Sequence, residues 1–74
     1  MKNPKNSKFV KEFGKNLKRI RTEKGLSHEY LADEANIGIN QIARIEKGEV
    51  NTTITTAYAL AKALKIDIAE LFGS

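Results

Sequence analysis

Three side chains with paired hydrogen-bonding groups lie within five residues near the middle of the chain. Asn40, Gln41 and Arg44 carry the amide and guanidinium groups that can pair bidentately with adenine or guanine edges in DNA. Ile39, directly before them, can contact the methyl group of thymine. These residue types would allow base reading, although an ordinary polar helix face would contain the same ones.

A short amphipathic helix is predicted around these residues. Ile42 and Ile45 must face inward, and at about 100° per residue this turns Asn40, Arg44 and Lys47 outward. A glycine stands before the first residue of this helix and another after its last residue, as is typical of helix boundaries.

A second short helix is predicted immediately before this one. Ser27 is a suitable N-cap, and Leu31, Ala32 and Ala35 give the helix a narrow apolar side. Asn36 can adopt the left-handed conformation that ends it. Two helices joined by a tight turn, with a polar face remaining on the second, fit the major groove of duplex DNA.

Three further helices are predicted from apolar periodicity and capping residues. The first follows Ser7 and contains Gly14, which indicates a tight helix contact; the fourth follows Thr53, and a short fifth follows Asp67 and ends near Phe72. No strand pattern is present, so the predicted fold is an all-α domain of five helices. The predicted organisation is a flexible basic arm at residues 1–6, the helical domain at residues 7–72 and a tail at residues 73–74.

Length and composition narrow the class of protein. A chain of 74 residues forms one domain with a small core, and the absence of cysteine excludes disulfides and thiolate metal sites. With one histidine, no glycine-rich phosphate loop and no metal-ligand spacing, we expect no catalytic residues, no metal, no cofactor and no enzyme activity. No apolar run of about 18 residues or secretory signal is present, which favours a cytoplasmic protein without a membrane contact.

Positive charge is concentrated at the N-terminal end. Residues 1–24 contain nine Lys and Arg against two Glu, a net charge of +7, whereas residues 25–74 contain four basic and seven acidic residues, a net charge of −3. Such a one-sided distribution favours a polyanionic partner, and a lysine face kept for solubility is the alternative.

Residues 13–72 resemble the Cro/C1-type (xenobiotic-response-element-like) repressors, a family that includes phage repressors and restriction–modification controller proteins. The residues that carry this resemblance are Arg21, Gly25, Leu26, Ser27, Leu31, Ala32, Ile37, Ile42, Arg44, Ile45, Glu46, Gly48, Asn51, the run from Leu60 to Leu64, and Glu70, Leu71 and Phe72. Three positions depart from the family pattern, because Asn36 replaces the usual glycine, Gly38 the usual serine or threonine, and His28 the usual glutamine.

The resemblance implies a compact lambda-repressor-like DNA-binding domain whose third helix lies in the major groove of double-stranded DNA. The base-reading residues would be Ile39, Asn40, Gln41 and Arg44. The phosphate-binding residues would be His28, Lys47, Asn51, Thr52 and Thr53. Arg21 and Glu46 match a structural ion pair between the first and third helices. At His28 the phosphate contact would depend on pH, or the histidine has no role.

The C-terminal segment is expected to form a homodimer interface. Its apolar residues are Ile66, Ile68, Leu71 and Phe72, with Tyr58 at the edge. In similar controller proteins this region forms the two-fold contact, and closure of the single-chain core is the alternative.

The sequence therefore predicts a transcriptional regulator, preferentially a repressor, that binds a pseudo-palindromic operator as a homodimer. The alternative is a protein-interaction module, such as the antitoxin of a toxin–antitoxin pair. A protein partner such as a toxin or RNA polymerase stays open at this point.

Overall fold

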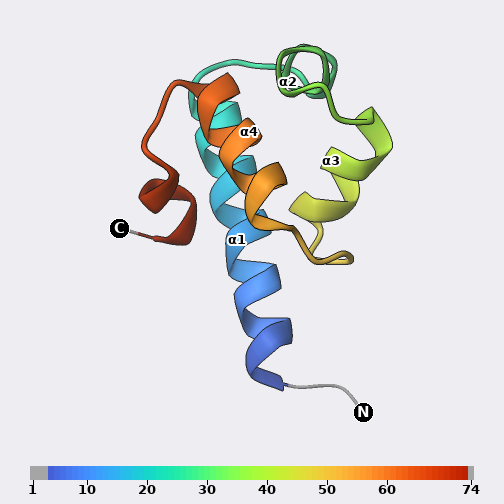
Figure 1. Cartoon of the computed structure of the whole chain (residues 1–74), viewed down its shortest axis with the longest axis vertical. Coiled ribbons are helices and arrows are strands. Elements are labelled where there is room, and N and C mark those ends of the chain that lie inside the picture. The colour runs from blue at the N-terminus through green and yellow to red at the C-terminus, as the bar shows by residue number, and fades with distance from the viewer. Residues whose placement is uncertain (1–3, 74) are drawn as a thin grey trace.

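The computed structural model describes residues 4–73 and shows helices packed around one core (Figure 1). The elements in chain order are α1 (Pro4–Glu23), α2 (His28–Ala35), α3 (Ile39–Glu46), α4 (Ile54–Leu64) and the 3₁₀ helix η1 (Ile68–Phe72). The predicted all-α fold is confirmed, and the fifth predicted helix is this short 3₁₀ helix.

Helix α1 begins earlier than its sequence predicts. It starts at Pro4, so the expectation that Ser7 caps it is wrong, and residues 4–6 of the predicted arm are helical. Proline favours the first helical position because its φ angle is already helical and the N–H that it lacks would have no partner there. Residues 1–3 of the arm and residue 74 of the tail lie outside the described residues.

The predicted ends of the two central helices are confirmed. The Ser27 hydroxyl accepts the backbone N–H of Tyr30 at 3.0 Å and begins α2, and Asn36 ends α2 in the left-handed region with φ 57°. Gly38 begins α3 in extended conformation and provides no side-chain cap. The turn between the two helices therefore contains only Asn36, Ile37 and Gly38.

Side chains from every helix form the core. Its fully buried large residues are Leu17, Leu31, Ile42, Ile45, Leu60, Leu64 and Leu71. Leu71 closes this core from η1, so the expectation that it faces a second subunit is wrong. Ile66 and Ile68 are half-buried against the same core, whereas Phe72 stays 60% exposed.

Helices α1 and α3 touch at Gly14. A Cβ atom at this position would collide with the carbonyl oxygen of Ile45 and would lie 2.9 Å from that of Glu46. The C-terminal turn of α3 thus lies directly on the backbone of α1, which confirms the tight contact that the glycine indicates.

Candidate nucleic-acid interface

Helices α2 and α3 form a pair on the side of the molecule away from η1 and the C-terminal end (Figure 1). Ile42 and Ile45 hold α3 to the core, with exposures of 0% and 1%. The exposed residues of α3 include all those expected to read bases: Asn40 and Arg44 lie opposite Ile42 and Ile45, and Ile39 and Gln41 lie at the boundaries of that face. Amide, guanidinium and aliphatic groups are therefore exposed together on one helix.

A buried ion pair fixes the inner side of α3. The Arg21 Nε donates to Oε2 of Glu46 at 2.7 Å, and Nη2 donates to Oε1 at 3.2 Å. The same guanidinium donates from Nη1 to the carbonyl oxygen of Leu26 at 2.7 Å. One planar group thus links α1, the segment between α1 and α2, and α3, which a flexible ammonium group would do less well.

His28 also contacts this carboxylate, and no pattern in the sequence predicts this contact. Its Nε2 lies 2.8 Å from Oε1 of Glu46, and its side chain is 36% exposed. Because an ionised carboxylate can only accept, Nε2 must carry a hydrogen. The other ring nitrogen, Nδ1, can then donate to a phosphate only when the imidazole is protonated.

The two basic side chains keep Glu46 ionised. Burial by itself raises the pKa of this carboxyl, but hydrogen bonds from Arg21 and His28, together with their charges, outweigh burial and hold the pKa below its ordinary value of 4.5. Because the pKa of Glu46 is lowered on folding, its ionised carboxylate stabilises the folded state.

Arg44 forms an exposed ion pair with a residue that sequence reasoning missed. Its Nε lies 3.8 Å from Oε1 of Glu49, and the two side chains are 60% and 53% exposed. Exposed pairs of this kind contribute about 0–1 kcal/mol. The Arg44 guanidinium can therefore leave Glu49 for another acceptor at little cost.

The loop after α3 contains the other expected phosphate ligands. The Asn51 side-chain oxygen accepts the backbone N–H of Thr52 at 2.9 Å, so the Asn51 amide hydrogens can donate to another acceptor. The Thr53 hydroxyl accepts the N–H of Thr56 and donates to the Thr56 hydroxyl, both at 3.1 Å. Thr53 is thus used as the predicted cap of α4, while Lys47 is exposed at the end of α3.

Neither a metal-ion site nor a membrane-spanning helix is present in the described part of the chain. Within residues 4–73, no group of three or more His, Asp or Glu could hold a metal ion. None of the helices described there is both long and apolar enough to span a membrane.

Residues 17–71 match the helix-turn-helix family HTH_3. The chain belongs to this family. It is a DNA-binding transcriptional regulator of the Cro/C1 type. The family is non-enzymatic, which agrees with the prediction made from the composition of this chain.

Relatives of this regulator include repressors and controller proteins. The uncharacterised HTH-type transcriptional regulator y4dJ of Sinorhizobium fredii is 36% identical over 58 residues, which are 78% of this chain and 75% of that protein. The immunity repressor of Bacillus phage phi105 is 35% identical over 60 residues, which are 81% of this chain and 42% of the repressor. The restriction-modification controller protein C.AhdI of Aeromonas hydrophila has a similar structure, with a TM-score of 0.83, 36% identity and coverage of 85% of this chain and 96% of C.AhdI.

Removing the Glu46 carboxylate tests the ion pair. We expect Glu46→Ala to lower the free energy of unfolding by about 3–5 kcal/mol at neutral pH, because it leaves the buried Arg21 unpaired. Since the folded-state pKa of Glu46 is lowered, its contribution is complete above the unfolded value and is lost as the pH falls through the folded value. Urea unfolding from neutral to acidic pH should therefore show the two proteins converging in acid.

Glu23→Ala is the matched control, because Glu23 forms an exposed pair with Arg19 at 3.5 Å. It should change the free energy of unfolding little at any pH. Equal stability of Glu46→Ala and the unmodified chain at neutral pH would contradict the structural role of the pair.

Proposed function

We propose that this regulator binds a pseudo-palindromic DNA operator as a homodimer, with α3 in the major groove, and represses transcription in the cytoplasm by occupying a promoter. The observation that carries the proposal is the exposed α3 face described above, held at a fixed angle by the buried Arg21–Glu46 pair. The similarity to a phage immunity repressor supports repression.

Each exposed group on this face has a suitable acceptor or contact in the groove. Arg44 suits guanine, the amides of Asn40 and Gln41 suit adenine, and Ile39 suits the thymine methyl group. Around the groove, phosphates would be bound by Lys47, Asn51 and Thr52, by the backbone N–H at Thr53 and, at the start of α2, by His28.

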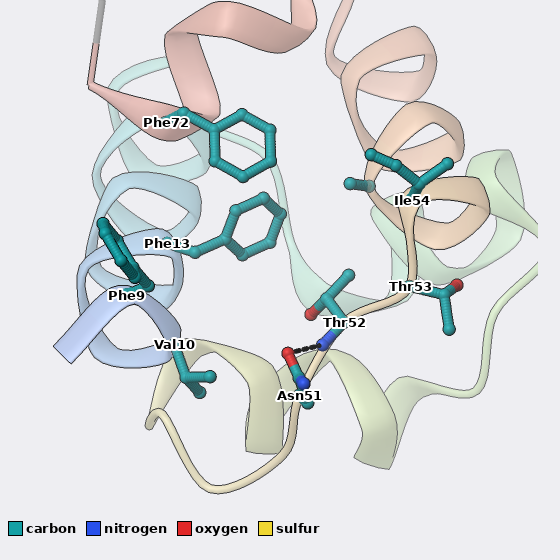
Figure 2. Close-up of a pocket in the computed structure, with 9 residues that line it drawn as sticks. Phe9, Val10, Phe13, Asn51, Thr52, Thr53, Ile54 and Phe72 are labelled. Atoms are coloured by element: carbon teal, nitrogen blue, oxygen red, sulfur yellow. Dashed lines mark hydrogen bonds between the residues drawn. The ribbon is translucent and has the colours of Figure 1, made fainter. Parts of the chain in front are cut away.

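The homodimer is proposed through an apolar hollow between α1, α4 and η1. This hollow has a volume of about 190 Å³, and Figure 2 shows Phe9 of α1 and Ile54 of α4 on its two sides, with Phe72 of η1 between them. Phe9 and Ile54 are 67% and 74% exposed, which is high for large apolar side chains. Phe72 packs on Phe13 with ring centroids 5.3 Å apart, and it remains 60% exposed to solvent.

The position of the hollow supports a second copy of the chain as its occupant. Asn51 and Thr52 line the same hollow, so a subunit bound there would lie beside the loop that is expected to contact phosphates. Reading two half-sites about one helical turn apart requires two chains held in a fixed relation near the DNA backbone. Of the apolar residues expected at the interface, Phe72 lines this hollow, whereas Ile66 and Ile68 are half-buried against the core.

Base reading is tested at Arg44 and its competitor. Arg44→Ala should weaken operator binding by about 1–3 kcal/mol and relax the preference at one base pair of each half-site. Glu49→Gln should strengthen binding, because it removes both the competing carboxylate and a negative charge near DNA. Selection of duplexes from a random pool, followed by titration of operator and random DNA, measures both effects. An equal loss on operator and random DNA would identify Arg44 as a phosphate ligand instead.

The dimer is tested by removing apolar surface without adding charge. The double variant Phe9→Ser, Ile54→Ser should keep its fold, because both side chains are largely exposed, and should become monomeric in sedimentation equilibrium. It should bind one half-site but lose the added affinity for two half-sites. Ile39→Ser is the control, since it should weaken DNA binding and leave the mass unchanged. An unmodified chain that stays monomeric at high micromolar concentration, with and without DNA, would exclude the dimer.

A further inference from the structure

We infer that α1 provides a second DNA contact, in which a lysine stripe formed by Lys8, Lys11, Lys15 and Lys18 binds the sugar–phosphate backbone beside the groove that α3 occupies. This inference rests on the proposed DNA binding. It concerns a different helix and a sequence-independent contact.

The four lysines share one face of α1. Steps of three, four and three residues return to the same side of a helix, and all four residues are exposed. Among the residues that the structure describes, none of the four forms an ion pair, whereas neighbouring Arg19 is paired with Glu23. The stripe therefore keeps its full positive charge toward solvent.

The lysine stripe flanks the end of α3. A Cβ atom placed on Gly48, directly after α3, would lie 3.1 Å from the Cα atom of Lys11. One turn further along α1, Gly14 touches the backbone at Ile45 and Glu46. In Figure 1 the N-terminal half of α1 continues past this end of α3 and past the loop that follows it. The exposed Lys47, which directly precedes Gly48, therefore lies near the stripe.

The dimensions of the stripe suit a DNA backbone. Ten residues separate Lys8 from Lys18, a rise of about 15 Å along the helix. At roughly 3.4 Å per nucleotide along one strand, this length spans about four phosphates. An acidic protein surface would also attract lysines, but the continuity with the α3 face places the phosphate backbone of the bound duplex nearest to them.

The test compares two pairs of lysines. The stripe variant is Lys8→Gln, Lys15→Gln, which spares Lys11 because its backbone packs against the turn at Gly48. The control variant is Lys62→Gln, Lys65→Gln, which removes the same charge at the C-terminal end of α4. Thermal unfolding of the free proteins confirms that both variants fold.

The readout is the slope of log K against log salt for an operator duplex with long flanks and for random DNA. In the stripe variant we expect the slope to fall in magnitude by about 2, with the same fold-loss of affinity on both duplexes, because phosphate contacts carry no sequence information. In the control variant the slope should stay close to that of the unmodified chain.

Three outcomes overturn the inference. An unchanged slope in the stripe variant would show that α1 makes no backbone contact, while base reading by α3 still stands. An equal fall in both variants would indicate a general effect of net charge. If the unmodified chain fails to bind DNA at all, the proposed function fails first, and retention of an acidic protein by the stripe would identify the other partner class.

Discussion

The carboxylate of Glu46 is the group on which the arrangement of this domain depends. It belongs to the last residue of α3 and receives hydrogen bonds from α1, through Arg21, and from α2, through His28. Three helices are thereby fixed relative to one another at a single point. A carboxylate so nearly enclosed is stable only when its lone pairs are satisfied, and here both oxygens have donors.

This arrangement separates two kinds of electrostatic interaction. The buried charges are compensated and set the orientation of α3, whereas the exposed charges on α1 and α3 lack strong partners within the described residues and are available to a polyanion. The same chain thus uses arginine in two ways. Arg21 is surrounded by acceptors of its own fold, and Arg44 is held only by an exposed carboxylate that water and DNA can replace.

Much of this fold could be predicted from sequence because its causes are local. The caps at Ser27 and Thr53, the left-handed Asn36 and the inward isoleucines of α3 follow from residue type and helical period. The 3₁₀ form of η1 could not be predicted, because a segment of only five residues is compatible with either helix type.

The parts of the site that sequence did not reveal depend on contacts between distant residues. His28 and Glu46 are separated by 18 positions. No rule of sequence spacing predicts a contact between the first residue of α2 and the last residue of α3. Likewise, Glu49 follows the end of α3, where the chain no longer has helical periodicity, so its approach to Arg44 depends on the turn at Gly48. The exposure of Asn40 and Arg44 could be predicted, because helical periodicity puts them on the side of α3 opposite Ile42 and Ile45.

The two ends of α3 differ in how firmly they are held. The C-terminal end rests on Gly14 and contains Glu46, whereas the first turn begins at Gly38 without a side-chain cap. Ile39 and Asn40 therefore lie on the less firmly held end, and in the proposed complex the ordering of this turn in the groove would cost entropy. That cost would weaken the complex, whereas the freedom of the first turn would let it adapt to small differences in groove shape while the end at Gly14 keeps its position.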